Sequence, residues 1–393
     1  MADNNHFKVN FRCFEQSLNT PQTSFKFIHA SDIHLGCHQY RNEYRSDDFI
    51  RAFQEILQLA ISYRVDFILL GGDVFTSLEM LPGKLNKIVN ILKDFFKYTK
   101  NSILIIAIEG NHDIRKFSRG ARFKKRGQSW LKFLANLGLI IVLDADLQAT
   151  PKEMFKPYNF ETHKGGKVKV KNAIIYGTRY LGESPISYLS KIRKGIPNTD
   201  GMFHILLQHF GIEGQMKNVP GINIDKIQHL RHRIDYLALG HFHKQFILDG
   251  WIYNPGSSEA ACSIDSSFKR GVFLVKVIRK EKYIKKVQMI RLNNRKHLWE
   301  TIFCPNDIKT RIVLYKYIIR KLKISLNSLD PNIEPSNYKM PILYLILKGS
   351  KPSNSSKINV QELSKLILSE IPVVDVRIFQ KFTNSSKPLD IYL

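Results

Sequence analysis

Short apolar runs alternate with amphipathic stretches along the first third of the chain. Residues 25–30, 65–70 and 103–108 are apolar runs of the length expected for buried strands. Between them, apolar residues recur at helical spacing over residues 49–63 and 85–96. Strands that alternate with amphipathic helices predict an α/β fold with buried sheets.

The pattern changes twice further along the chain. From about residue 167 it becomes richer in strands. After about residue 292, helical patterns over 307–322 and 360–368 alternate with strand patterns over 342–347 and 373–379. We expect this last part to form a separate small α/β domain. The predicted domains are a flexible lead-in over residues 1–24, a main domain over 25–292 and a small domain over 293–393.

Clusters of metal-ligand residues follow these apolar runs. In open α/β sheets, ligands bind beyond the carboxyl ends of the strands, so we expect the clusters to meet in space. Aspartate, asparagine and histidine together form a ligand set for two divalent ions held close to each other. The candidate ligands are Asp32, His34, Asp73, Asn111, His209, His241 and His243.

The spacing of the candidates suggests how they are presented. Asp32 and His34 are two positions apart, and so are His241 and His243; in an extended backbone such pairs point the same way. Asp73 follows two glycines, and a single carboxylate there could bridge two ions.

Two residues beside Asn111 suggest catalysis more than metal binding. His112 could protonate the leaving oxygen or stabilise the charged transition state. Asp113 is then a candidate for orienting the His112 imidazole.

The chain is strongly basic, with a formal net charge of +26 and a sequence pI near 9.8. This excess favours a polyanionic partner, with nucleic acid first and an anionic membrane second, although lysine can also simply solvate a surface. A basic cluster directly after His112 could contact a DNA backbone or form a solvated loop. Its members are Arg115, Lys116, Arg119, Arg122, Lys124, Lys125 and Arg126.

Several classes of protein are disfavoured. The four cysteines form no Cys-x-x-Cys pair, so neither a disulfide framework nor a thiolate zinc site is expected. No apolar run is long enough to cross a bilayer, and the N-terminal residues have no signal-peptide pattern. We therefore expect an intracellular protein, cytoplasmic or nucleoid-associated in a prokaryote and nuclear in a eukaryote.

The motifs resemble those of the calcineurin-like metallophosphoesterases: Asp32-Ile33-His34, Gly72-Asp73, Gly110-Asn111-His112-Asp113 and Gly240-His241-Phe242-His243. The stretches around the first three motifs are most similar to the Mre-eleven and SbcD family of DNA double-strand-break repair nucleases. The stretch Tyr253–Glu259 also resembles the end of that family's nuclease domain.

The resemblance implies a β-sandwich flanked by helices, with a small C-terminal α/β DNA-capping domain. It implies two manganese ions, with Asp73 shared between them. Asp32, His34 and His243 would complete one site, and Asn111, His209 and His241 the other. His112 would be the catalytic histidine. Thr76 departs from the family pattern, because some members have a second histidine there.

The resemblance also implies an activity and partners. The family hydrolyses DNA as a 3′-to-5′ exonuclease and an endonuclease, and works as a homodimer with an SMC-like ATPase of the Rad-fifty or SbcC type. Apolar stripes at Leu85, Ile88, Leu92 and Phe95, and at Trp130, Leu131 and Leu134, could form the dimer interface or pack on the chain's own sheet. Two other functions stay open: an enzyme for small phosphoesters or cyclic nucleotides, and a non-catalytic scaffold with the same fold.

Overall fold

The computed structural model of this chain describes residues 24–114, 129–182, 185–198, 201–350 and 357–383. The predicted lead-in therefore lies almost entirely outside the described residues. The chain divides into two compact units. The first contains residues up to Gln39 and Phe49–Asn293, and the second contains Tyr40–Asp48 and the residues from Asn294. The sequence had placed Tyr40–Asp48 in the main domain.

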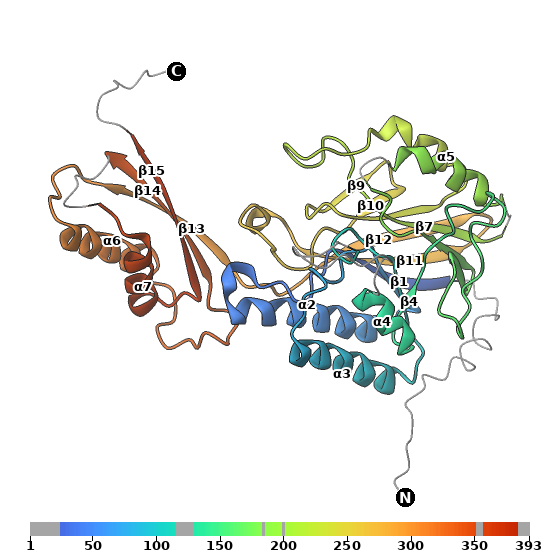
Figure 1. Cartoon of the computed structure of the whole chain (residues 1–393), viewed down its shortest axis with the longest axis horizontal. Helices are drawn as coiled ribbons and strands as arrows, with labels where there is room; N and C mark the ends of the chain where they lie inside the picture. Colours follow the sequence, from blue (N-terminus) through green and yellow to red (C-terminus); the bar gives the residue numbers. More distant parts are fainter. Residues whose placement is uncertain (1–23, 115–128, 183–184, 199–200, 351–356, 384–393) are drawn as a thin grey trace, which may run out of the picture. The chain divides into compact units, whose positions relative to one another are not determined.

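The first unit contains two six-stranded sheets, each with a parallel centre (Figure 1). In the first sheet, β1 to β4 run parallel and the antiparallel strands β11 and β12 extend it beyond β1. The order is β12-β11-β1-β2-β3-β4. The strands are β1 (Ser24–Ala30), β2 (Phe67–Leu70), β3 (Leu104–Ala107), β4 (Ile141–Val142), β11 (Gly271–Arg279) and β12 (Tyr283–Arg291).

The second sheet has the order β5-β6-β7-β8-β10-β9. Its strands β6, β7, β8 and β10 run parallel, with antiparallel strands at both edges. The strands are β5 (Lys167–Val170), β6 (Ala173–Gly177), β7 (Phe203–His209), β8 (Tyr236–Gly240), β9 (Phe246–Leu248) and β10 (Ile252–Asn254).

The two sheets pack face to face through aromatic side chains. The Phe27 ring lies 5.2 Å from Tyr236 between centroids, and Phe25 lies 5.7 Å from Phe203. All four side chains are buried, and they belong to one continuous core. The expected β-sandwich flanked by helices is therefore confirmed.

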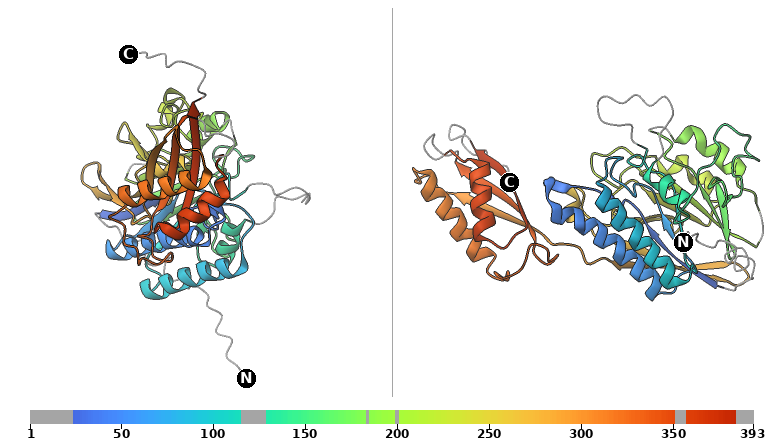
Figure 2. Two further views of the ribbon diagram at one scale, coloured as in Figure 1. Left: turned by 90° about the vertical axis from the view of Figure 1, so that its left-hand side faces the viewer. Right: turned by 60° about the horizontal axis from the view of Figure 1, so that its bottom comes forward.

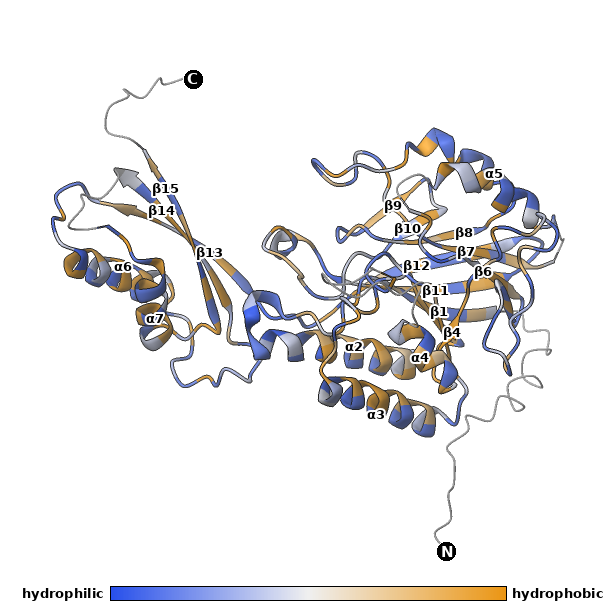
Figure 3. Cartoon of the chain, in the orientation of Figure 1, coloured by the Kyte–Doolittle hydropathy of each residue, from blue (hydrophilic) through white to orange (hydrophobic). Residues whose placement is uncertain are grey.

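Helices cover the outer faces of the sandwich. On the first sheet these are α2 (Glu43–Ser62), α3 (Pro82–Thr99) and α4 (Trp130–Asn136), and α5 (Ile186–Gly195) packs on the second sheet. In Figure 3, α2 and α3 alternate hydrophobic and hydrophilic colours along their turns, as helices with one buried face do. Four 3₁₀ segments complete the described elements: η1 (Gln39–Arg41), η2 (Ile224–Lys226), η3 (Gln228–Leu230) and η4 (Ile264–Ser267).

Most of the two apolar stripes that suggested a dimer interface is buried in the chain's own core. Ile88, Leu92 and Phe95 of α3 are at most 4% exposed, and Leu131 and Leu134 of α4 are fully buried. These side chains pack against the first sheet as helix faces normally do, whereas Leu85 and Trp130 of the same stripes are only partly buried.

The second unit is a parallel three-stranded sheet with two helices. The sequence pattern predicted four of its elements but not the first strand, whose alternate positions are exposed. The elements are β13 (His297–Cys304), α6 (Arg311–Ser325), β14 (Ile342–Ser350), α7 (Val360–Glu370) and β15 (Asp375–Thr383). Among the described helices of both units, none combines the length and apolar composition that crossing a membrane requires.

A buried ionic cluster ties Tyr40–Asp48 into the second unit. Asp48 accepts hydrogen bonds from Arg45 at 2.5 Å and from Arg295 at 2.6 and 3.1 Å. Arg295 also donates to the carbonyl oxygens of Asn337 and Met340. All three charged side chains are at most 4% exposed. Removing one of them would leave a buried charge without its partner, so the cluster holds this segment in place.

Candidate metal centre

The candidate ligands lie at the carboxyl ends of parallel strands in both sheets. Asp32 follows β1, Asp73 follows β2 and Asn111 follows β3, while His209 ends β7 and His241 follows β8. Parallel strands present their carboxyl ends at one edge of a sheet, and the stacked sheets bring the two edges together. Ligands that are more than 200 positions apart in the chain therefore meet.

Three overlapping groups of side chains could each hold an ion. Within each group, one ligand atom from every residue lies within 4.8 Å of the others. Asp73 belongs to two groups, as expected of a carboxylate between two ions, and Asp32 and His34 are also shared. The groups are Asp32, His34 and His243; His34, Asp73 and His112; and Asp32, Asp73 and His209.

Asn111 and His241, the remaining candidates, lie at the same centre. Its Oδ1 lies 3.0 Å from His209 Nε2 and 3.1 Å from His241 Nδ1. His209 Nε2 also lies 3.3 Å from Asp73 Oδ2. The structure thus brings together every residue that the sequence suggested as a ligand.

The hydrogen-bond chemistry of His209 fits a cation. Its Nδ1 donates to the Gly71 carbonyl oxygen at 2.7 Å, so Nε2 of the neutral ring carries a lone pair. That lone pair faces Asn111 Oδ1 and Asp73 Oδ2, which are themselves acceptors. These contacts need a positive charge among them, either a proton on Nε2 or a metal ion, and imidazole, carboxylate and amide oxygen together suit a divalent ion.

His243 is held in the same way by a residue that the sequence analysis missed. Asp265, in η4, accepts a hydrogen bond from His243 Nδ1 at 2.8 Å, which turns His243 Nε2 toward His34 Nε2 at 3.0 Å. Asp265 also accepts the backbone N–H groups of Ala261 and Cys262. A carboxylate behind a ligand imidazole fixes the ring and raises its basicity. No apolar strand precedes Asp265, so nothing in the local sequence marks it.

The surrounding charges set the protonation of these side chains. Burial would raise the pKa of Asp73, but His209, His34 and His112 lower it below its ordinary value. Burial would lower the pKa of His209, but Asp73 and Asp32 raise it to about 9. Burial lowers the pKa of His34 to about 3. A proton on His209 Nε2 therefore occupies the position that a metal ion would take, so the proton and the metal compete for this atom.

His112 has an anchored ring with an accessible edge. Its Nδ1 donates to the Thr76 carbonyl oxygen at 2.9 Å, and its backbone N–H donates to Asp73 Oδ1 at 2.7 Å. Its side chain is 29% exposed, whereas that of Asp73 is 3% exposed. The Nε2 atom lies 4.0 Å from Asp73 Oδ2, at the border between the buried centre and solvent. A group placed so can exchange a proton with a bound substrate.

Asp113 does not orient the His112 ring as we had expected. Its carboxylate accepts the backbone N–H groups of Phe75 and Gly110, both at 2.9 Å, and that of Val74 at 3.3 Å. Asp113 thus ties the loop after β2 to the loop after β3. The partner of the His112 ring is instead Thr76, through a backbone atom that any residue type supplies.

The backbone at the ligands is not extended, which corrects a second expectation. Asp32 and His34 have φ values of 50° and 52°, Asp73 has 50° and His241 has 93°. Non-glycine residues rarely adopt this left-handed region, and such strain concentrates at functional sites. Asp32 and His34 share a group because the chain turns between them, not because they lie on one face of a strand.

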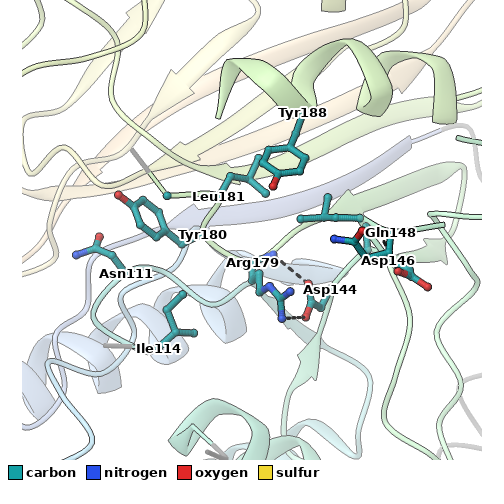
Figure 4. Close-up of a pocket in the computed structure, with 12 residues that line it drawn as sticks. Asn111, Ile114, Asp144, Asp146, Gln148, Arg179, Tyr180, Leu181 and Tyr188 are labelled. Atoms are coloured by element: carbon teal, nitrogen blue, oxygen red, sulfur yellow. Dashed lines mark hydrogen bonds and ion pairs between the residues drawn. The ribbon is translucent and has the colours of Figure 1, made fainter. Parts of the chain in front are cut away.

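A pocket of about 750 Å³ lies beside the centre, with Asn111 in its wall (Figure 4). Tyr180 lines it and contacts two ligand histidines, with its ring 5.9 Å from His209 and 6.0 Å from His241 between centroids. Arg179 and Asp144 form an ion pair in its wall at 3.6 Å. The pocket therefore joins a polar wall to an aromatic ring next to the candidate ligands.

The basic cluster that the sequence suggested as a DNA contact lies outside the described residues. Of the cysteines in the described part of the chain, Cys37 and Cys304 are buried and Cys262 is exposed. Cys37 belongs to none of the three groups.

The fold and the centre define a class of protein, and a family comparison agrees with it. The sequence model of the calcineurin-like phosphoesterases matches residues 25–245, which is more than half of the chain. The chain therefore belongs to the calcineurin-like phosphoesterase family.

Within that family, the resemblance to the Mre-eleven group is confirmed by archaeal relatives. The chain is 30% identical to the DNA double-strand break repair protein Mre11 of Archaeoglobus fulgidus over 241 residues, 60% of this chain and 50% of the relative. It is 25% identical to Mre11 of Sulfurisphaera tokodaii over 346 residues, 86% of this chain and 78% of the relative. It is also 26% identical to the uncharacterized metallophosphoesterase YhaO of Bacillus subtilis, over 65% of this chain and 58% of the relative. The match thus spans about half the length of the Archaeoglobus relative.

Proposed function

We propose that this protein is a manganese-dependent DNA nuclease that processes broken ends, with 3′-to-5′ exonuclease and endonuclease activity. The observation that carries the proposal is the convergence of acceptor atoms around Asp73. His209 Nε2 faces Asp73 Oδ2, Asp32 belongs to the same group, and His34 joins Asp73 in a second group. Two ions that share one carboxylate are the arrangement that phosphodiester hydrolysis uses.

The two proposed metal sites overlap at Asp73. When bound, the two ions would hold phosphate oxygens and lower the pKa of a bound water to near neutrality. The chain's part is to keep each imidazole in the tautomer that offers its lone pair, through Gly71 behind His209 and Asp265 behind His243. One site comprises Asp32, His34, Asp73 and His243, and the other comprises Asp73, Asn111, His209 and His241.

His112 is the proposed proton donor. Its Nδ1 is occupied by the Thr76 carbonyl oxygen, so Nε2 is the atom that can carry a proton to the leaving oxygen. Asp73 holds the His112 backbone, which couples the position of the donor to the position of the shared carboxylate. Asp113 supports both indirectly by joining the two loops.

Charge and pocket chemistry favour a nucleic acid substrate. The net charge of +26 supplies attraction to a polyanion, and the relatives that carry the Mre11 name are DNA repair proteins. The pocket beside Asn111 can take one nucleotide against Tyr180. We retain the basic cluster Arg115, Lys116, Arg119, Arg122, Lys124, Lys125 and Arg126 as proposed phosphate contacts. Neutralising Lys124, Lys125 and Arg126 should flatten the salt dependence of binding by roughly one unit per lost contact.

The assembly is also part of the proposal. By resemblance we propose a homodimer that works on DNA with an SMC-like ATPase of the Rad-fifty or SbcC type, in the compartment that holds DNA. Most of the apolar stripes of α3 and α4 is buried, so a dimer interface on these helices would use their partly exposed residues, such as Leu85 and Trp130. Light scattering at micromolar concentration tests the homodimer directly, since a monomeric mass contradicts it.

The decisive experiment compares two substrates on one protein. Purified chain is incubated with linear duplex DNA and, in parallel, with a chromogenic phosphodiester, with manganese or with a chelator. We expect manganese-dependent cleavage of both substrates, with DNA much preferred, and chelation should stop both. Degradation of DNA that persists in the chelator would indicate a contaminating nuclease.

The alternative function is that of an enzyme for small phosphoesters or cyclic nucleotides. The pocket of about 750 Å³ favours it, because that volume could hold a free nucleotide. Turnover of the small substrate with intact DNA would establish this alternative. A non-catalytic scaffold would turn over neither substrate, but the complete ligand set argues against it, because a scaffold that needs no metal would be free to lose some of the ligands.

A further inference from the structure

In the described part of the second unit, the two crossover helices leave one face of the sheet uncovered, except at the end where Tyr40 and Asn42 contact Tyr344 and Asp375. The strand order β13-β14-β15 follows the chain, all three strands are parallel, and α6 and α7 form the two crossovers. Two right-handed crossovers that move in the same direction place both helices on the same face. Figures 1 and 2 show α6 and α7 together on one side of the strands. Parallel sheets are normally covered on both faces, so the open face is unusual.

The strand register identifies which residues occupy the open face. Leu343, Leu345 and Leu347 point to the helix side, since they form one core with α6 and α7. The alternate positions therefore belong to the open face, and pairing places them in rows across the sheet. The rows are Trp299, Tyr344 and Arg377; then Thr301, Ile346 and Phe379; then Phe303, Lys348 and Lys381.

Large aromatic rings are exposed on this face. Trp299 is 48% exposed, Phe303 is 65% exposed and Phe379 is 36% exposed. The Trp299 ring is nearly parallel to the rings of Tyr344 and Phe379, at centroid distances of 4.5 and 5.8 Å. These rings form a flat surface that water covers poorly.

The layer beneath holds the flat surface in place. Tyr344 is fully buried, and its hydroxyl lies 2.9 Å from that of Tyr40 and 3.1 Å from His297 Nδ1. Trp299 stacks on this anchored ring, so little side-chain freedom is lost when a ligand stacks on Trp299 in turn.

The charges among the rings are positive. Lys348 lies over the Phe303 ring, and Lys381 and Arg377 occupy the neighbouring strand on the same face. Among the described positions of this face, the acidic residue is Asp375, which lies at the start of β15 and accepts a hydrogen bond from Asn42. A flat aromatic surface bordered by cations is complementary to unpaired bases on a phosphate backbone.

We propose that the open face of β13, β14 and β15 binds single-stranded nucleic acid, with bases stacked on Trp299 and Phe379 and phosphates near Lys348 and Lys381. This inference goes beyond the proposed nuclease function, because it assigns a binding site to the second unit and needs no metal. Stacking tolerates any base, so the site should have little sequence preference. A duplex, whose bases are already stacked, should gain nothing from the rings.

The test measures binding by the full chain in a metal chelator, so that no cleavage occurs. Three fluorescein-labelled probes of equal length are used: a 20-nucleotide oligothymidine, an abasic strand and a duplex. Trp299→Ala and Phe379→Ala should each weaken oligothymidine binding about tenfold or more, and leave abasic and duplex binding unchanged. Tyr98→Ala is the matched control, since Tyr98 is a 72% exposed aromatic residue of the first unit and should have no effect.

A conservative variant separates stacking from loss of structure. Trp299→Phe keeps a ring, so it should bind oligothymidine to within a few-fold of the native chain. The chain has three tryptophans, and the other two lie in the first unit, so Trp299→Phe should abolish the quenching of tryptophan emission by bound oligothymidine. Lys348→Gln with Lys381→Gln should weaken the oligothymidine and the abasic strand alike.

Three outcomes would overturn the proposal. Oligothymidine binding that is unchanged in Trp299→Ala and Phe379→Ala removes the stacking site. Equal losses on the oligothymidine and the abasic strand mean that the rings do not contact bases. Unchanged binding together with a fall in solution mass identifies the face as a protein interface. Failure of the nuclease proposal would look different, because hydrolysis would be absent while the ring variants still lost oligothymidine binding.

Discussion

The candidate metal centre in the first unit and the open sheet face in the second unit position their side chains in opposite ways. At the metal centre, hydrogen bonds fix each ring from behind: Gly71 holds His209, Asp265 holds His243 and Thr76 holds His112. On the sheet face, strand register and stacking place Trp299 and Phe379, and their rings stay exposed.

This contrast explains why the first region could be predicted from the sequence and the second could not. A metal centre needs particular donor atoms at particular strand ends, so its residue types cannot vary without loss of ligands. A stacking surface needs any flat ring at alternate positions of neighbouring strands. Such positions become meaningful only when the pairing of β13, β14 and β15 is known. We expect the side chains of the first region to act together through their hydrogen bonds, whereas the second unit should depend on its own buried contacts.

The largest effect should come from the shared carboxylate. Asp73→Ala removes the carboxylate that the two proposed sites share, and it takes away one partner of His209 and of the His112 backbone. We expect phosphodiester hydrolysis to disappear, measured as product formed per enzyme over hours in manganese. Asp94→Ala, which changes an exposed aspartate of α3, is the control and should retain full activity. Near-normal cleavage by Asp73→Ala would show that the two sites share no carboxylate.

A smaller loss should follow removal of the proton donor. His112→Ala should reduce turnover by roughly 10²–10⁴-fold, the range of general acid–base catalysis, with manganese binding preserved. Calorimetry and single-turnover kinetics measure the two quantities separately. His112 also lies in one metal group with His34 and Asp73, so the loss of one bound ion in the variant would make it a ligand instead.

The sequence predicted the ligand set better than it predicted how the ligands are held. Apolar runs located β1, β2 and β3, and the residues after them proved to be neighbours in space. The left-handed backbone at Asp32 and His34 could not be foreseen, because non-glycine residues give no signal for it. Asp265 was missed for a related reason, since its role depends on a contact across 22 positions in a loop. The helix stripes were ambiguous because a face that packs on a sheet and one that packs on a partner share the same period.

The second unit should lose stability when its buried ionic cluster is broken. Asp48→Ala leaves Arg45 and Arg295 buried without their shared carboxylate, at an expected cost of about 3–5 kcal/mol. Hydrogen exchange followed by mass spectrometry should show faster exchange in β13, β14 and β15, with β1, β2 and β3 unchanged. Asp307→Ala, at an exposed position of the same unit, should change neither. Equal acceleration in both sheets would mean that the two units unfold together.

The smallest and most pH-dependent effect should come from the residue behind His243. Burial would lower the pKa of His243, but the hydrogen bond to Asp265 and the charge of Asp32 raise it to about 9. Below that pH a proton occupies His243, so metal affinity should rise with pH up to about 9 and then level off.

Asp265→Asn removes the hydrogen bond that contributes most to raising the pKa of His243. This change should weaken metal binding by His243 by about 10–100-fold, but it also lowers the affinity of the ring for the competing proton. The two effects oppose each other near pH 7, where the variant should bind manganese almost as well as the native chain. At about pH 9 the proton competes only weakly in the native chain, so most of the deficit should appear in calorimetric titrations. A deficit of the same size at both pH values would mean that Asp265 only positions the ring and leaves its basicity unchanged.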